Sequence, residues 1–189
     1  MSIGTEKTLK TLILYWTATK NTEKVADAIK RRLEQENVTP DVVKITAEEI
    51  IDFYSYDLVF MGTPSYSYLP PDPALQFIQN NMKHYRDQGH IKLQAPKIPG
   101  KTAVVFCTYS GPHTGINEAI PVVKYLGQFF EHLGFDVAGE WCIVGEFHGH
   151  EDFSTRGRLG DIRGRPNEQD LAKIEKDVNK IVASLRNNR

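Results

Sequence analysis

The sequence has little cysteine, no excess of either charge and no long apolar run. Each of these deficits excludes a class of protein. Only two of the 189 residues are cysteines, Cys107 and Cys142, and both lie inside apolar stretches. We therefore expect two buried, small hydrophobic side chains rather than a disulfide. No metal-ligand spacing accompanies them, so no metal site is predicted.

The charge balance is equally uninformative about a partner. Acidic and basic residues nearly cancel, leaving a formal net charge of -1. Such a chain shows no surface that would seek nucleic acid and no acidic tail.

No window approaches the about 18 uninterrupted apolar residues of a membrane span, and the N-terminus lacks the apolar core of a signal peptide. We expect a soluble, cytoplasmic protein with no membrane span and no nucleic-acid partner.

The length and composition favour one folded unit. With 40% hydrophobic residues, the chain is long enough to bury a full core without disulfides or metal. No internal repeat or low-complexity tract divides it. The expected organisation is a single domain over residues 1–189.

Five apolar runs predict the strands of a sheet. They lack the alternation of a half-exposed strand, which favours parallel strands covered on both faces. The runs lie at residues 11–16, 42–45, 58–63, 102–108 and 140–147.

Five segments with helical periodicity alternate with these runs. They lie at residues 21–36, 46–53, 72–86, 116–133 and 167–187. Alternating strands and helices predict an α/β fold, a doubly wound, three-layer arrangement in which helices cover both faces of a five-stranded parallel sheet. Two segments fit no element, a connector at 87–101 and a longer one at 148–166.

The first strand is followed by Thr-Ala-Thr-Lys-Asn-Thr at residues 17–22. In open parallel sheets, ligands bind beyond the carboxyl ends of the strands. A helix N-terminus there favours an anion, and hydroxyl and amide groups suit phosphate oxygens. The alternative is that Thr and Asn merely cap the helix, although a cap needs only one or two such residues.

The loops after the third and fourth predicted strands contribute tyrosines among small residues. Tyr66 and Tyr68 lie in one loop and Tyr109 in the other. Tyrosine faces can stack on a planar ring, and small neighbours let backbone groups reach its polar edge. Any one of these tyrosines could simply be packed. Together with the phosphate loop, they indicate a nucleotide site.

These segments give the sequence its resemblance to the flavodoxin-like family, a resemblance that covers nearly the whole chain. Its phosphate loop follows a strand-end aromatic with Ser or Thr, a small residue, Thr and then Ala. Here Tyr15 is followed by Thr17, Lys20, Thr22 and Ala26. Only Lys20 departs from the pattern, standing where the family usually has Gly, Ala or Cys. A Cβ there penalises a positive φ, whereas the lysine charge would attract phosphate.

The resemblance implies the strand order 2-1-3-4-5, with FMN bound where the order reverses. It also implies that Tyr66 stacks on the flavin ring and that Tyr109 covers its other face. The predicted cofactor-binding residues are Thr17, Ala18, Thr19, Lys20, Asn21, Thr22, Pro64, Ser65, Tyr66, Ser67, Tyr68, Thr108, Tyr109, Ser110, Gly111, His113 and Gly115.

Within this family, the sequence resembles the NAD(P)H:quinone oxidoreductases more than the carriers. Carrier flavodoxins are usually strongly acidic, and this chain is not. The sequences HTG at 113–115 and GRPNEQDL at 164–171 are similar to the oxidoreductase branch. The resemblance implies electron transfer from NAD(P)H or a protein donor to a quinone or other acceptor, in a homo-oligomer. Two alternatives stay open: a flavodoxin-type electron carrier, and a flavodoxin-fold binding module without a cofactor.

The segment at 148–166 holds the remaining candidates. Arg156, Arg158, Arg163 and Arg165 could grip nicotinamide nucleotide phosphates, bridge subunits or form a solvated basic loop. The histidines of the segment are interpreted as part of a mobile surface loop. Outside it, His113 is the one catalytic candidate, because an imidazole beside a flavin can donate a hydrogen bond or a proton to a quinone.

Overall fold

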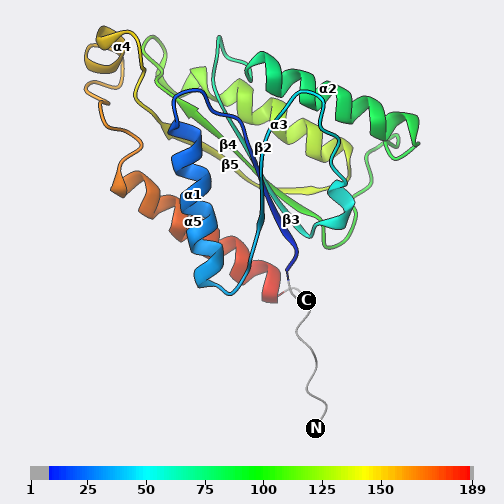
Figure 1. The fold of residues 1–189 in the computed structure, drawn as a ribbon. Helices are drawn as coiled ribbons and strands as arrows, with labels where there is room; N and C mark the ends of the chain where they lie inside the picture. Colours follow the sequence, from blue (N-terminus) through cyan, green and yellow to red (C-terminus); the bar gives the residue numbers. More distant parts are fainter. Residues whose placement is uncertain (1–8, 188–189) are drawn as a thin grey trace.

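Figure 1 shows the computed structural model, which describes residues 9–187, as a parallel sheet between two layers of helices. The five strands stand in the order β2-β1-β3-β4-β5, which confirms the predicted order. Their bounds are β1 (Thr11–Tyr15), β2 (Asp41–Lys44), β3 (Leu58–Pro64), β4 (Thr102–Tyr109) and β5 (Asp136–Val144). The order reverses between β1 and β3, so the carboxyl ends of these strands flank the crevice where such sheets bind ligands.

Two pairs of helices cover the two faces of the sheet (Figure 1). One face carries α1 (Asn21–Gln35) and α5 (Glu168–Asn187), which pack against each other. The other face carries α2 (Asp72–Asp87) and α3 (Ile120–His132). The predicted doubly wound, three-layer α/β architecture is therefore confirmed.

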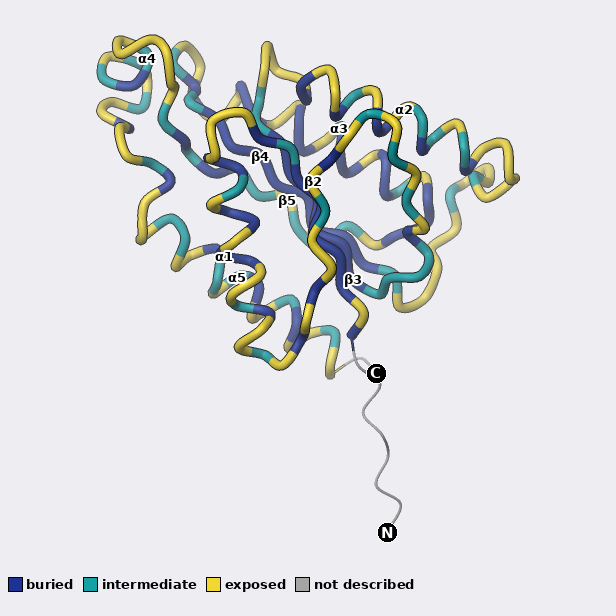
Figure 2. Tube along the Cα trace, viewed as in Figure 1, coloured by how far each residue is buried: buried dark blue, intermediate teal, exposed yellow. Residues whose placement is uncertain are grey.

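The central strands are buried on both faces, as their unbroken apolar runs predicted (Figure 2). In β1, Leu12 and Leu14 join the core beneath α2 and α3. Ile13 and Tyr15 point to the other face and join the core beneath α1 and α5. Successive side chains of a strand face opposite ways, so a strand covered twice has no position that faces solvent.

The two edge strands differ from this expectation. In β2, Asp41, Val42 and Lys44 are exposed, and in β5 exposed and half-buried residues alternate. An edge strand has a neighbour on one side only, so less of it is covered. The expectation that all five strands are covered on both faces is wrong for β2 and β5.

The fifth strand lies earlier in the chain than the predicted 140–147. Its pairing with β4 runs from Asp136 to Val144, and the Gly145 N–H donates to the Tyr109 carbonyl at 2.8 Å. The Glu146 N–H then donates to the carbonyl of Arg165, not to β4. Residues 145–147 therefore form a loop at the carboxyl edge of the sheet.

The helix predicted at 46–53 is absent from the structure, which has only a short 3-10 helix, η1 (Phe53–Ser55), in this region. Side chains of α2 take its backbone hydrogen bonds instead. Asn81 Oδ1 accepts the Ile51 N–H at 3.0 Å, and the Tyr85 hydroxyl donates to the Ile51 carbonyl at 2.7 Å. These tertiary bonds satisfy an extended backbone, so the capping-box spacing had no helix to cap.

The helix predicted at 116–133 is divided in two. A 3-10 helix, η2 (Gly115–Glu118), precedes α3, whose second residue is Pro121. Proline lacks an N–H and is suited to a first helical turn, so it favours a new start at this point. The other three predicted helices are found within one residue of their expected bounds.

The sequence predicted two buried cysteines without a disulfide and no membrane-spanning segment. Cys107 and Cys142 are both free and lie opposite each other on β4 and β5. Cys107 is buried and Cys142 is half-buried, and burial raises the pKa of the Cys142 thiol to about 11. Within residues 9–187, no helix is long and apolar enough to cross a membrane.

Candidate functional site

A cavity of about 480 Å³ opens at the carboxyl edge of the sheet. Its volume is within the range of about 300–1,000 Å³ that is typical of small-molecule sites. Loops after β1, β3, β4 and β5 line it. Every predicted site residue lines this cavity except Lys20 and Gly115. The loops were predicted to meet at one edge, and the structure brings them together there.

The loop between β1 and α1 does not use its polar side chains to cap the helix. The N-cap residue is Lys20, and it makes no side-chain capping bond. Instead, Thr22 Oγ1 lies 2.9 Å from Thr108 Oγ1, and Asn21 Nδ2 donates to the Glu146 carbonyl at 2.8 Å. These bonds fasten the loop to its neighbours, so capping does not account for its composition.

The backbone of this loop leaves donors available. The first intrahelical N–H to find a partner is that of Lys24, which donates to the Lys20 carbonyl at 2.9 Å. The N–H groups of Asn21, Thr22 and Glu23 precede it and have no carbonyl one turn earlier in the helix. They lie at the positive end of the α1 dipole, which favours an anion beside Thr17 and Thr22.

Lys20 has a left-handed backbone, with φ 68° and ψ 0°. A residue in this conformation followed by helical residues turns consecutive N–H groups to one side and forms an anion-binding concavity. The lysine Cβ is unfavourable there by about 1–2 kcal/mol. The departure from the family pattern at this position is therefore a strained residue in an otherwise typical loop.

Replacing Lys20 separates this strain from the lysine charge. Lys20→Gly is expected to raise the free energy of unfolding by about 1 kcal/mol, because glycine adopts φ 68° without a steric penalty. Lys20→Ala removes the same charge but keeps the Cβ, and is expected to bring no such gain. Urea unfolding of the flavin-free variants measures the difference. Equal stability of the two would show that the loop carries no strain.

The loop after β3 projects two tyrosines at the rim of the cavity. Tyr66 and Leu69 form a backbone bridge that closes a tight turn over Ser67 and Tyr68, which have φ values of 50° and 69°. Tyr66 and Tyr68 are 47% and 53% exposed. The Trp16 ring meets that of Tyr66 edge-on at 5.9 Å between centroids. The ring of Tyr66 is thus held from one side while much of its surface stays accessible.

Tyr109 differs from these tyrosines because it is buried, with 8% exposure, and forms part of the inner wall. It ends β4 and packs in the core beneath α2 and α3. Burial raises the pKa of its hydroxyl, so the side chain is a neutral phenol at ordinary pH.

The loop after β4 is held by a buried carboxylate. Glu118 Oε1 accepts the His113 N–H at 2.8 Å and the Thr114 N–H at 2.6 Å. Ser65 of the neighbouring loop donates its hydroxyl to the Glu118 carbonyl. Gly111 has φ 54°, and a Cβ on it would lie 2.7 Å from the Gly115 carbonyl oxygen. The loop is therefore preorganised, with Glu118 as its internal anchor.

The fourth wall of the cavity comes from residues 145–165, which we call the strap. Phe147, His148 and Phe153 of the strap line the cavity, and none of them was among the predicted site residues. The predicted fifth strand extended through Phe147, which concealed the loop after it. The one available signal was the length of the segment at 148–166.

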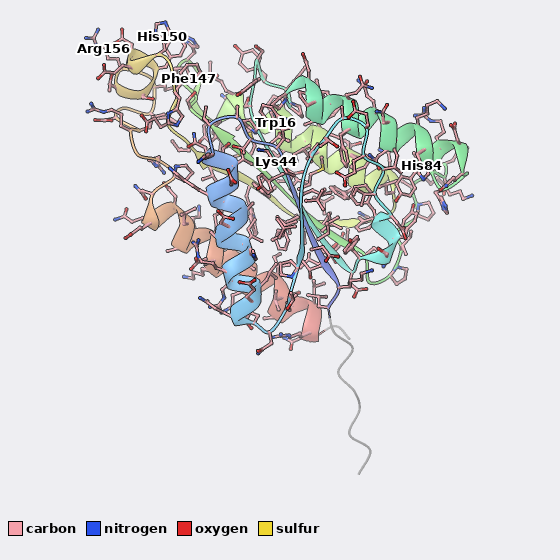
Figure 3. All side chains as sticks on the ribbon, in the orientation of Figure 1. Trp16, Lys44, His84, Phe147, His150 and Arg156 are labelled. Atoms are coloured by element: carbon pink, nitrogen blue, oxygen red, sulfur yellow. The ribbon has the colours of Figure 1, made fainter. Side chains whose placement is uncertain are left out.

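The strap, interpreted from the sequence as part of a mobile surface loop, is folded and makes hydrogen bonds within itself. It contains a short helix, α4 (Glu151–Thr155), from which Ser154 Oγ accepts the Phe147 N–H at 2.8 Å. The Ile162 N–H donates to the Ser154 carbonyl at 2.8 Å, and both residues are buried. Figure 3 shows Phe147 and His150 gathered at the α4 end of the molecule.

An aromatic cluster joins the strap to the loop after β4. The Phe153 ring meets His113 edge-on at 5.6 Å, stacks on His150 at 4.9 Å and contacts Phe147 at 5.1 Å. Among the residues that the structure describes, no group of three or more His, Cys, Asp or Glu side chains is placed to hold a metal ion. Of the two strap histidines, His150 packs against an aromatic ring, that of Phe153.

The residues present fit an FMN molecule at both ends. The open N–H groups at the start of α1 suit its phosphate, and the accessible face of Tyr66 suits its ring. Between them, Asn21 Oδ1 is buried and has no hydrogen-bond partner in the described chain. A buried acceptor without a donor is costly, and a ribityl hydroxyl would supply that donor.

Comparison with known proteins supports this fit. The family model for flavodoxin matches residues 13–175. No curated protein sequence matches the chain. Oxidised flavodoxin 2 from Bacillus cereus is 18% identical with a TM-score of 0.66, over 93% of this chain and 99% of that chain. A flavodoxin from Streptococcus pneumonia TIGR4 is 18% identical with a TM-score of 0.64, over 92% and 98%.

A third similar structure is named as WrbA-like. The flavodoxin, WrbA-like protein from Agrobacterium tumefaciens is 14% identical with a TM-score of 0.62, over 96% of this chain and 100% of that chain. At such identities, the likeness to solved structures establishes the fold. Because the flavodoxin family model spans most of the sequence, the chain belongs to the flavodoxin family, an FMN-binding family of electron-transfer flavoproteins.

Proposed function

We propose that the protein is an FMN-dependent oxidoreductase that passes electrons from NAD(P)H to a quinone or a similar small acceptor. The observation that carries this proposal is the strap. Its aromatic residues Phe147 and Phe153 extend the cavity beyond the loops proposed to hold the flavin. A walled space of this kind suits a small substrate that must lie beside a flavin ring.

The proposed division of the site follows its loops. Residues 17–22 hold the phosphate, and residues 64–68 and 108–115 hold the ring. When bound, FMN supplies the redox chemistry, since its ring accepts and donates electrons, and the protein supplies binding and orientation. The net reaction consumes NAD(P)H, a proton and a quinone and yields NAD(P)⁺ and a hydroquinone.

His113 is the proposed proton or hydrogen-bond donor to the quinone. Its backbone is fixed by Glu118 and its ring packs edge-on against Phe153, beside the cavity. An imidazole held in this way can donate to an oxygen that gains charge as the quinone is reduced.

The assay uses the FMN-loaded protein with NADH or NADPH and a water-soluble benzoquinone. We expect NAD(P)H to bleach the visible flavin band and the quinone to restore it. His113→Ala is expected to lower turnover by about 100-fold, the lower end for loss of an acid-base group, with flavin affinity retained. His84→Ala, which changes a histidine at the far end of α2 (Figure 3), is the matched control. Unchanged turnover and flavin affinity in His113→Ala would refute the assigned role.

A flavodoxin-type electron carrier is the second candidate. Exposed Tyr66, Tyr68 and Leu69 give the cavity an uncharged rim that a protein partner could cover. Flavodoxins are also among the most similar solved structures. A flavin-loaded protein that neither NADH nor NADPH reduces, but that a reduced redox protein does reduce, would favour this candidate.

A further inference from the structure

The four arginines of the strap are not equivalent. Arg163 pairs with Asp161 at 2.6 Å, and Arg165 pairs with Asp170. Arg156 Nε lies 3.5 Å from Asp152 (Figure 3 labels Arg156). Within residues 9–187, no carboxylate pairs with the guanidinium of Arg158. Arg158 is therefore the one strap arginine without a carboxylate partner among the residues that the structure describes.

Arg158 is also the arginine that the backbone fixes to the loop after β4. Its N–H donates to the Pro112 carbonyl at 2.8 Å. Its side chain lies over η2, where Arg158 Cδ is 3.5 Å from the position that a Cβ on Gly115 would occupy. Gly157 permits this approach, because a Cβ there would lie 2.9 Å from Pro112 Cα. Arg158 is thus held beside the loop after β4 that carries His113, although it does not itself line the cavity.

The chemistry of this cation favours a small anion over a protein surface. Recognition of an acidic protein needs a field from many charges, but the chain has a net charge of -1 and the other strap arginines are neutralised. A single exposed guanidinium instead suits a bidentate bond to one phosphate group. Phe147 and Phe153, which line the cavity, offer aromatic surface for a ring of the same ligand.

We infer that Arg158 binds the diphosphate of the nicotinamide nucleotide and so positions the electron donor against the flavin. This inference rests on the proposed oxidoreductase function and specifies its donor site. Arg156, Arg163 and Arg165 stay in their ion pairs and shape the strap. Gly115, which does not line the cavity, keeps the space beneath Arg158 open.

The test compares Arg158→Ala with Arg156→Ala in the FMN-loaded protein. Arg156 is the matched control because it lies two residues away in the same strap and is exposed. Arg158→Ala is expected to raise the KM for NAD(P)H by about 10- to 100-fold, the loss of one charge-assisted bond. The kcat and the FMN affinity should be unchanged, and the KM should become less sensitive to salt. Arg158→Lys should restore only part of the KM, because an ammonium lacks the bidentate fork.

The outcomes separate this inference from the proposed function. If the wild-type protein oxidises NAD(P)H and both alanine variants share its KM, Arg158 is not the donor anchor and only the inference fails. If Arg158→Ala instead lowers the mass of an oligomer without changing the KM, the residue bridges subunits and the inference also fails. If neither NADH nor NADPH reduces the wild-type flavin, the proposed function fails and the inference with it.

Discussion

Riboflavin is expected to bind to the flavin-free protein at least about 1,000-fold more weakly than FMN. The two flavins differ only in the terminal phosphate, so their ratio of affinities isolates the contribution of residues 17–22. The uncommitted N–H groups of Asn21, Thr22 and Glu23 can donate to that phosphate. A hydrogen bond to a charged group contributes about 1.5–3 kcal/mol, so two such bonds of about 2 kcal/mol each give a factor of about 1,000.

The same loop offers a matched pair of variants for this prediction. Thr22→Val is nearly isosteric, removes the Thr22 hydroxyl and leaves the Thr108 hydroxyl without its partner. It is expected to weaken FMN binding and to leave riboflavin binding nearly unchanged. Thr155→Val removes the hydroxyl of a half-buried threonine in α4 that does not line the cavity, and serves as the control. Fluorescence titration of each flavin gives the dissociation constants, and equal affinities for FMN and riboflavin would contradict a phosphate site in this loop.

Gly62→Ala is expected to lower the free energy of unfolding by about 3 kcal/mol or more. Gly62 lies in β3 directly opposite Phe106 of β4, and the phenyl ring covers the position where a Cβ would lie. That Cβ would be 2.0 Å from Phe106 Cε2, and Phe106 is fully buried. Overpacking a filled core forces neighbours off their rotamers, and here a whole ring would have to move.

The double variant Gly62→Ala with Phe106→Leu tests this cause directly. Leucine has no ring to meet the new methyl group, so the two changes together should cost less than the sum of their separate costs. Urea unfolding of the flavin-free protein gives all four stabilities. If the costs simply add, or if Gly62→Ala is as stable as the wild type, the contact with Phe106 does not explain why glycine occupies this position.

Much of this architecture could be predicted because the sequence signals are strongest where the sheet is most buried. The runs that became β1, β3 and β4 have no polar side chain facing a solvent layer, so they are unbroken and easily found. The loops at 17–22, 64–68 and 108–115 come directly after these strands, so finding the strand ends also locates the loops. Knowing the strand order is enough to bring them to one edge.

The errors arise where tertiary contacts decide the local structure. Asn81 and Tyr85 hold the segment near Ile51 extended, although its sequence has the spacing of a capping box. These partners lie about thirty residues away in the chain, beyond the reach of a local pattern. The edge strand β5 has a less continuous apolar pattern, and its end was predicted at residue 147 instead of Val144. Phe147 was therefore assigned to the strand and not to the site.

Lys20 illustrates a different limit. The sequence indicated that a Cβ would oppose a positive φ, but only the structure gives the angle, 68°. It also leaves the lysine outside the cavity lining, so we expect Lys20 to act on a phosphate through charge and backbone rather than through a wall contact. A lysine can therefore occupy a left-handed position in this loop, at a cost in strain.

The most direct test is the visible absorption spectrum of the purified protein, recorded before and after addition of FMN, with identification of any flavin released on denaturation. We expect a flavin spectrum, tight binding of added FMN and release of a flavin with one phosphate. A colourless protein that binds no added FMN would contradict the account, because the fold would then be present without its cofactor site.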